Sequence, residues 1–219
     1  MFKLSGIPAN KKLFKEAIEN CDWLKYKSFK PGLWAMDNFA LYTLFNILER
    51  IKPKNILEFG MGQSSKMVHQ YAQFFENVTA VTIEHNREWA EAFCKNIPED
   101  LKINVKFFDT EIIKVNGFKT LTYKNIDDIW GKGGYDLIIV DGPFGSKHHS
   151  RSQIVNIIKY GLPEHFCIFM DDTERNGEKE TVKEICRELG EKGIKHLVKE
   201  NRGIRKHHTI IYSADTVWY

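Results

Sequence analysis

The spacing of apolar positions changes near residue 53 and divides the chain into two parts. Before that point apolar residues recur at helical spacing, as in the stripe over residues 41–51, so two helices are predicted. Pro53 ends the second of them. The pattern therefore predicts an N-terminal helical segment over residues 1–52, packed on a larger domain over residues 53–219.

After Pro53, short apolar runs alternate with amphipathic stretches of helical length. The runs predict strands at residues 55–59, 78–85, 103–110, 135–143, 166–172, 195–200 and 208–215. Such alternation indicates βαβ units and a parallel sheet covered by helices on both faces. Only a turn separates the last two strands, so the last one is predicted to run antiparallel. The sequence thus predicts an α/β fold with a Rossmann-like, doubly wound, mostly parallel seven-stranded sheet and an antiparallel last strand.

The first four predicted strands each finish with an acidic residue. These acids are Glu58, Glu84, Asp109 and Asp141. Ligands of such sheets bind beyond the carboxyl ends of the strands, so the four carboxylates are predicted to converge there. Acids are common at strand ends, but capping alone does not account for four at one edge. Because buried carboxylates need partners, a ligand rich in hydroxyl and amino donors is indicated.

The stretch ILEFGMGQSSK, residues 56–66, joins the first strand to its helix. Gly60 and Gly62 allow a sharp turn and a close approach of the backbone to a ligand. Ser64 or Ser65 can cap the following helix and leave N–H groups facing the site. Taken alone, the loop is equally compatible with a tight turn and a serine cap that bind nothing.

Two acids near this loop indicate the kind of nucleotide. Glu84 lies 22 residues beyond Gly62, a position suited to accept hydrogen bonds from a ribose diol. A dinucleotide-binding loop usually has a third small residue where this chain has Ser65, and it receives a pyrophosphate. Glu58, just before the glycines, would repel a pyrophosphate but suits a ligand with a cationic amino-acid end.

At these positions the sequence resembles class I S-adenosylmethionine-dependent methyltransferases. EFGMG resembles their first motif, Glu84 their ribose-binding acid, and Asp109 with Thr110 their adenine-side polar position. DLIIVDGP resembles the motif of their fourth strand, and the resemblance covers roughly residues 53–219. It implies S-adenosylmethionine as the cofactor. The residues expected to bind it are Glu58, Gly60, Gly62, Ser64, Ser65, Glu84, His85, Asp109, Thr110 and Asp141.

Four stretches carry a closer resemblance, to methyltransferases that tailor sugars and polysaccharides, including the glucuronoxylan-methylating group. They are LEFGMGQSS, VTIEHNREW, VDGPFG and FMDDTERNGE. This resemblance implies O-methylation of a sugar or another small hydroxylated acceptor. A free hydroxyl is a poor nucleophile and needs a base or a metal. Asp141 is the first candidate for the base, or for holding the methionine end of the cofactor. His148 or the neighbouring His149 is the second, because imidazole titrates near neutral pH.

Some related O-methyltransferases bind magnesium through acids after the fourth and fifth strands. Asp171 and Asp172 stand after the fifth predicted strand, Asp141 stands near the end of the fourth, and oxygen ligands suit magnesium. Alternatively, these acids pair with nearby cations. The cations are Lys147, Arg151 and Arg175. Because DDTER supplies its own arginine, magnesium is possible but not favoured.

Composition narrows the class of protein and its partners. The chain has 219 residues and a net charge of +3, from 32 basic and 29 acidic residues, which is too balanced to indicate nucleic acid or membrane. No apolar run approaches the roughly 18 residues of a membrane span, and no signal peptide is evident. The four cysteines lie far apart without a CxxC pair, which indicates reduced core thiols. We therefore expect a cytoplasmic protein that acts on a small-molecule or glycan acceptor; the sequence leaves its oligomeric state open.

Two other classes of protein remain as alternatives. An NAD-dependent oxidoreductase or epimerase on a similar sheet would need GxGxxG and a Tyr-x-x-x-Lys pair, and no such pair stands in a suitable place. A non-catalytic binding module could keep the fold. The intact GxG and the strand-end acids favour the enzyme over the module.

Overall fold

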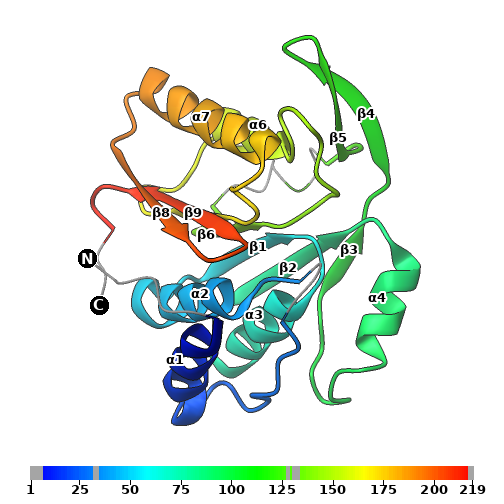
Figure 1. The fold of residues 1–219 in the computed structure, drawn as a ribbon, viewed down its shortest axis with the longest axis vertical. Helices are drawn as coiled ribbons and strands as arrows, with labels where there is room; N and C mark the ends of the chain where they lie inside the picture. The colour runs from blue at the N-terminus through cyan, green and yellow to red at the C-terminus, as the bar shows by residue number, and fades with distance from the viewer. Residues whose placement is uncertain (1–6, 32–34, 127–128, 130–133, 217–219) are drawn as a thin grey trace.

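The computed structural model describes residues 7–31, 35–126, 129 and 134–216. A seven-stranded sheet with the order β3-β2-β1-β6-β7-β9-β8 lies at its centre (Figure 1). The strands of this sheet are β1 (Asn55–Phe59), β2 (Thr79–Glu84), β3 (Val105–Phe107), β6 (Leu137–Val140), β7 (Cys167–Met170), β8 (His196–Arg202) and β9 (His207–Ser213). β9 pairs antiparallel with both β7 and β8, whereas the pairs among β3, β2, β1, β6 and β7 are parallel. The predicted fold class is confirmed.

Helices cover both faces of the sheet (Figure 1). One face carries α1 (Ile7–Glu19), α2 (Asn38–Ile51) and α3 (Gln63–Phe74); the other carries α6 (Gln153–Tyr160) and α7 (Asn176–Glu191). α4 (Arg87–Cys94) packs through Ala90 and Phe93 near β3. Successive strand residues point to opposite faces, so Ile56 joins the core under α2 and Leu57 the core under α6 and α7.

The direction of winding reverses between β1 and β6. From β1 the chain proceeds outward to β2 and β3, and from β6 it proceeds the other way to β7. Open α/β sheets bind their ligands outside the carboxyl ends of the strands at such a switch point. The loops after Phe59 and Val140 therefore occupy the expected place of a site.

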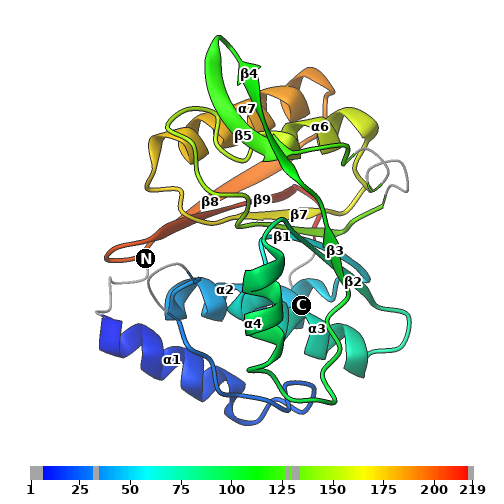
Figure 2. The same cartoon turned by 90° about the vertical axis from the view of Figure 1, so that its right-hand side faces the viewer.

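A β-hairpin between β3 and β6 was not predicted from the sequence. Its strands are β4 (Thr110–Val115) and β5 (Phe118–Tyr123), which form a separate two-stranded sheet. Asn116 and Gly117 both have positive φ, 49° and 85°, as a type I′ turn requires. The hairpin projects past α7 (Figure 2), where Asn116 Nδ2 donates to Glu184 Oε1 at 2.7 Å. The strand predicted over residues 103–110 accordingly ends at Phe107 and leads into this hairpin.

The N-terminal helices belong to the same apolar core as the sheet. Leu41, Leu44 and Leu48 of α2 are fully buried and share one cluster with Ile56 and Phe169. Asp37 is the N-cap of α2: its Oδ1 accepts hydrogen bonds from the N–H groups of the second and third helical residues at 2.9 and 2.8 Å. The division of the chain at residue 52 stays a prediction.

The structure also bears on two expectations from composition. None of the helices in the described ranges is long and apolar enough to cross a membrane. Cys167 is fully buried, but Cys94 is exposed, so the expectation of core thiols is wrong for Cys94.

We expect Leu44→Ala to lower the free energy of unfolding by about 2–5 kcal/mol, because it leaves a cavity in the core beneath α2. Arg50→Ala, on the exposed face of the same helix, is the control and should change it by less than about 0.5 kcal/mol. Urea unfolding followed by circular dichroism measures both. Equal effects of the two substitutions would contradict the placement of α2 in the core.

Candidate active site

The loop after β1 lies against the loop after β6 with no side chain between them. Gly60 has φ +88°, and a Cβ there would lie 2.5 Å from the Asp141 carbonyl oxygen. A Cβ on Gly142 would lie 2.8 Å from Gly60 Cα. Both positions therefore require glycine for the two loops to approach this closely.

Gly62 differs from Gly60 in both conformation and surroundings. Its φ of −169° is extended backbone that any residue adopts, and a Cβ there would meet nothing within 4 Å. Gly62 is the N-cap of α3, and its N–H donates to Ser65 Oγ at 2.9 Å. The expectation that a serine is the cap is corrected: Ser64 and Ser65 lie buried in the first turn of the helix.

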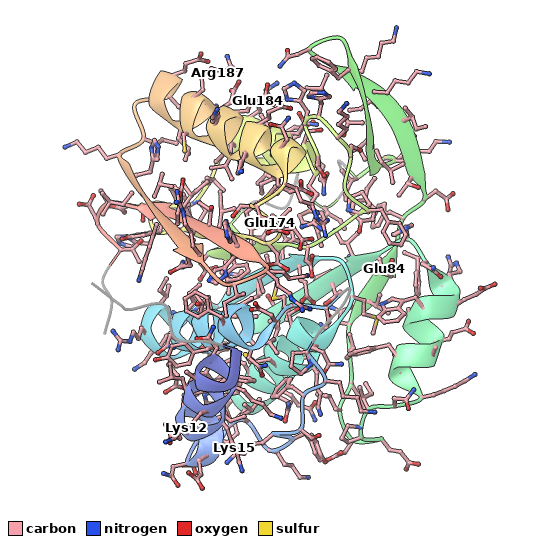
Figure 3. The ribbon with its side chains drawn as sticks, in the orientation of Figure 1. Lys12, Lys15, Glu84, Glu174, Glu184 and Arg187 are labelled. Atoms are coloured by element: carbon pink, nitrogen blue, oxygen red, sulfur yellow. The ribbon has the colours of Figure 1, made fainter. Side chains whose placement is uncertain are left out.

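Glu84 lies at the end of β2 (Figure 3) and holds the glycine loop, residues 60–62, against it. Its carboxylate accepts from the N–H groups of Met61, His85 and Asn86 at 2.8, 2.7 and 2.8 Å. Burial alone would raise the pKa of Glu84, but the His85 ring, whose Nδ1 lies 2.9 Å from Oε1, and these backbone hydrogen bonds outweigh it and lower the pKa. Trp89 Nε1 donates to the Met61 carbonyl at 2.7 Å, so Met61 is held on both sides.

Glu58 lies fully buried in β1 beneath the loop. Thr82 Oγ1 donates to Glu58 Oε2 at 2.6 Å, whereas Oε1 has no hydrogen-bond partner in the part of the chain that the structure describes. Burial raises the pKa of Glu58 to about 7, although the hydroxyls of Ser64, Ser65 and Thr82 oppose the shift. A buried carboxylate with an unpaired oxygen can accept from a donor on a ligand.

The other residues predicted to bind the cofactor lie along the end of β2 and the base of the hairpin. The His85 ring packs edge-on against Phe144, with centroids 5.4 Å apart. Phe108 N–H donates to the Glu84 carbonyl at 3.0 Å, which places the exposed Asp109 beside the end of β2. Thr110 begins β4. Glu58, Gly60, Glu84 and Asp109 are thus held at neighbouring positions on one edge of the sheet.

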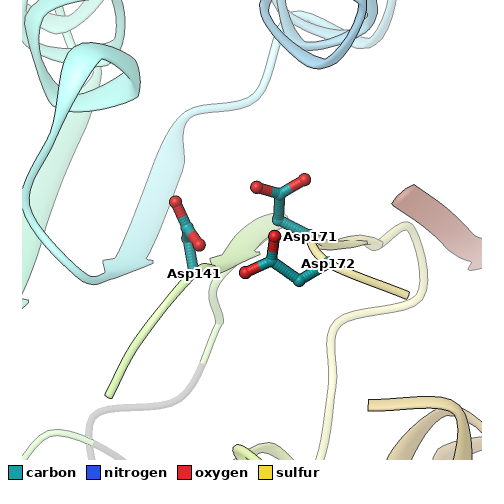
Figure 4. Close-up of side chains that lie close together, drawn as sticks. All are labelled: Asp141, Asp171 and Asp172. Atoms are coloured by element: carbon teal, nitrogen blue, oxygen red, sulfur yellow. The ribbon is translucent and has the colours of Figure 1, made fainter. Parts of the chain in front are cut away.

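Three aspartates lie side by side after β6 and β7 (Figure 4). Asp141, Asp171 and Asp172 each present an oxygen within 4.8 Å of the others. Arg151 crosses the group: its Nη2 lies 3.2 Å from Asp141 Oδ1 and 2.9 Å from Asp172 Oδ2. Only 3% of the Arg151 side chain is exposed, so these contacts are barely screened by solvent.

Two more cations complete this carboxylate cluster of Asp141, Asp171 and Asp172. Lys206 Nζ lies 3.0 Å from Asp172 Oδ1 and 3.6 Å from Asp171 Oδ2, and Arg175 Nη1 lies 3.0 Å from Asp172 Oδ2. Lys206, in the turn between the last two strands, was not among the cations that the sequence analysis named. Lys147, which was expected instead, is exposed and forms no ion pair with the residues that the structure describes.

The three aspartates differ in how readily they ionise. Burial raises the pKa of Asp141 to about 6, against the opposing charge of Arg151. The pKa of Asp171 is raised well above its ordinary value by burial and by the neighbouring carboxylates, and neither of its oxygens has a hydrogen-bond partner among the described residues. Burial would also raise the pKa of Asp172, but Arg151, Lys206 and Arg175 together lower it. The cluster therefore carries less negative charge than three ionised aspartates.

A divalent metal fits this cluster poorly. The three carboxylates have the oxygen chemistry that magnesium needs. However, Arg151 and Lys206 already approach the oxygens that would coordinate it, and Arg151 is too deeply buried to move aside without loss of packing. The three carboxylates are therefore better suited to ion pairs with Arg151 and Lys206 than to coordination of a metal.

The contacts of His148 are with α7 and the hairpin. His148 Nδ1 lies 3.0 Å from Glu180 Oε1, and its ring stacks on Phe118 with centroids 4.0 Å apart. None of the interactions found among the described residues joins His148 to the carboxylate cluster. Its catalytic role stays a prediction.

Comparisons with known proteins place this architecture among solved structures. No protein-family model matches the sequence, and no curated protein matches it. The O-methyltransferase TomG of Streptomyces achromogenes, solved with S-adenosylmethionine, is 16% identical over 97% of this chain and 92% of its own, with a TM-score of 0.50. An O-methyltransferase of Bacillus cereus, solved with S-adenosylhomocysteine, is 13% identical over 92% and 90%, with a TM-score of 0.51.

This chain has the fold of these O-methyltransferases. A spermidine synthase bound to a transition-state analogue also matches, at 13% identity over 78% of this chain and 58% of its own, with a TM-score of 0.50. The same fold therefore occurs in enzymes that catalyse different reactions, so the fold alone does not determine the reaction.

We expect Glu58→Gln and Glu84→Gln to change the pH dependence of stability in opposite directions. Because the folded-state pKa of Glu58 is raised, wild-type stability falls as pH rises from about 4.5 to about 7, and the glutamine removes that loss. Relative to wild type, Glu58→Gln should gain up to about 3 kcal/mol over this range.

Because the folded-state pKa of Glu84 is lowered, its effect is the reverse. Glu84 adds to the free energy of unfolding above pH 4.5, and this stabilisation is lost as pH falls through the folded-state pKa. Glu84→Gln should therefore lose stability relative to wild type as pH rises through that acidic range. Urea unfolding of the ligand-free protein between pH 3 and pH 8 measures both profiles. A Glu58→Gln profile parallel to wild type would show that Glu58 ionises normally.

Proposed function

We propose that this protein is an S-adenosylmethionine-dependent methyltransferase that methylates a hydroxyl group of a sugar or another small acceptor. One observation carries the proposal: at the switch point of the sheet, the buried acid Glu58 keeps an unpaired oxygen beside a glycine loop with open space at Gly62. The S-adenosylmethionine and S-adenosylhomocysteine in the TomG and Bacillus cereus structures support it, because they show which ligands this fold holds.

The residues of the loop suit the parts of S-adenosylmethionine. Glu58 can accept from the ammonium group of the methionine end, and the open space at Gly62 lets the ligand approach the backbone. Oε2 of Glu84 accepts one hydrogen bond, from Met61, so a lone pair is left for a ribose hydroxyl. Asp109 and Thr110, beside the end of β2, are suited to the adenine side.

When bound, S-adenosylmethionine supplies a methyl group activated by its sulfonium. The protein must then align the acceptor hydroxyl and remove its proton. Asp141 is our first candidate for the base: with a pKa of about 6, it is ionised at neutral pH and more basic than an ordinary aspartate. Arg151 and Lys206 balance the charge of the carboxylate cluster, so proton transfer there does not require a metal.

We expect Gly62→Val to weaken binding of S-adenosylhomocysteine by at least about tenfold, because the new side chain fills the open space beside the loop. The extended φ of Gly62 accepts valine, so the circular dichroism spectrum and melting temperature should stay close to wild type. Gly190→Val is the matched control, since a Cβ added at Gly190, near the end of α7, also meets nothing within 4 Å. Isothermal titration calorimetry measures the affinity for S-adenosylhomocysteine. If Gly62→Val binds it as tightly as wild type, the loop is only a turn and does not contact the ligand.

Methyl transfer itself is measured with S-adenosylmethionine and a panel of uronic acids, neutral sugars and catechols, first in EDTA and then with added magnesium. We expect turnover on at least one sugar, undiminished by EDTA. The rate should fall below about pH 6 as Asp141 becomes protonated. Activity lost in EDTA and restored by magnesium would overturn the metal-free arrangement. Thermal stabilisation by NAD instead of S-adenosylmethionine would favour the oxidoreductase, and stabilisation by neither would favour a binding module.

A further inference from the structure

A concave site lies between residues 25–30, the start of α3 and the end of α4, and none of its described lining residues belongs to the carboxylate cluster. Its volume is about 610 Å³, within the usual range for small-molecule sites. Five lysines line it: Lys25, Lys27, Lys30, Lys66 and Lys95. No acidic side chain is found among its described lining residues. This lysine cleft therefore concentrates positive charge in a protein whose net charge is only +3.

Lys66 is the most unusual of the five lysines. It is 8% exposed, and its Nζ donates to the Ser28 carbonyl at 2.5 Å and lies 5.2 Å above the Phe29 ring. None of the ion pairs in the described ranges includes Lys66. A buried ammonium group is costly without an anion, and the nearby charge of Lys30 adds to that cost. Both effects lower the pKa of Lys66, and a bound anion would oppose them.

The remaining lysines of the cleft are only partly engaged. Lys25 pairs with Asp100 at 2.9 Å, but both groups are exposed, so the pair is weak. Lys27 Nζ donates to the Glu19 carbonyl at 2.6 Å. Lys30 and Lys95 are exposed and belong to no ion pair in the described part of the chain. Several ammonium groups are thus available to one ligand.

We propose that the lysine cleft binds a phosphate-bearing small molecule. Phosphate fits the donors, because lysines act as compact point charges that surround a phosphate without a fixed fork. The described lining contains no arginine, so an anion in the cleft would meet point charges and not a planar fork. Gln63 also lines the cleft and begins α3, so the positive end of the helix dipole adds to the attraction. Phe93, Ile97 and Pro98 form an apolar wall for the uncharged part of the ligand.

Inorganic pyrophosphate is the probe, and citrate, a carboxylate anion of similar charge, is the comparison. By isothermal titration calorimetry at low salt we expect pyrophosphate to bind with one site per chain, more tightly than citrate, and to weaken as salt rises. Binding of citrate as tight as that of pyrophosphate would overturn the phosphate assignment. No heat with millimolar pyrophosphate would overturn the site.

Variants locate the binding. Lys30→Gln with Lys95→Gln should weaken pyrophosphate at least tenfold, and adding Lys66→Gln should weaken it further. The control carries Lys114→Gln and Lys119→Gln, a change of equal charge on the exposed hairpin, and should stay within twofold of wild type. If the triple variant does not fold, the double variant decides, because both of its lysines are exposed. Equal losses in the double variant and the control would show only general attraction.

A competition experiment tests whether the lysine cleft and the proposed cofactor site are separate. Saturating pyrophosphate should leave the affinity for S-adenosylhomocysteine within twofold of its value in buffer. Mutual exclusion of the two ligands would overturn the proposal that the lysine cleft is a separate site. Because no turnover is measured, the proposal stands or fails independently of methyl transfer.

Discussion

The site depends on one backbone contact, where Gly60 lies against Asp141 and Gly142 at the switch point of the sheet. A side chain at Gly60 would overlap the carbonyl of Asp141, and one at Gly142 would overlap Gly60. Parallel pairing of β1 with β6 brings the two loops to the same edge, and the two glycines let them touch. This contact places the glycine loop, Glu58 and Glu84 beside the start of the carboxylate cluster. The two loops are some 80 residues apart in the sequence. Each follows a strand of the sheet, and paired strands position the residues of a site more precisely than loops alone could.

The buried acids at this edge of the sheet differ in pKa, because they accept different numbers of hydrogen bonds. Glu84 receives three backbone N–H groups and remains an acid of low pKa that fixes the loop. Glu58 receives one hydroxyl at hydrogen-bonding distance on one oxygen and none on the other, so its pKa rises to about 7. Glu84 therefore fixes the loop and keeps only part of one oxygen for a ligand, whereas Glu58 keeps a whole oxygen without a partner among the described residues. Within the carboxylate cluster the same rule separates Asp172, which meets three cations, from Asp171, whose oxygens lack hydrogen-bond partners among the described residues.

Most of the fold could be predicted from the sequence because the central strands β1, β6 and β7 are short, buried apolar runs bounded by loops. The reversed last strand followed from the short turn before it. The hairpin was missed, although its signal was present: Asn116-Gly117 lies between stretches rich in β-branched residues. Helix starts were less predictable, since Gly62 and not a serine is the N-cap of α3. The strand-end acids were found because parallel topology alone brings them to one edge.

Pairings across the fold could not be predicted, because they depend on where separate elements meet. Lys206 follows β8 by only a few residues, yet it neutralises aspartates that follow β7. Lys66 looks in the sequence like a solvated lysine in the first turns of a helix, but in the fold it is buried, with its Nζ against Ser28 and Phe29. Both lysines are partly or largely desolvated, but one has carboxylates and the other has only a carbonyl and a ring. Burying the Lys66 ammonium without a counter-charge costs free energy that its contacts in the folded chain do not account for. An anion bound in the lysine cleft would offset that cost.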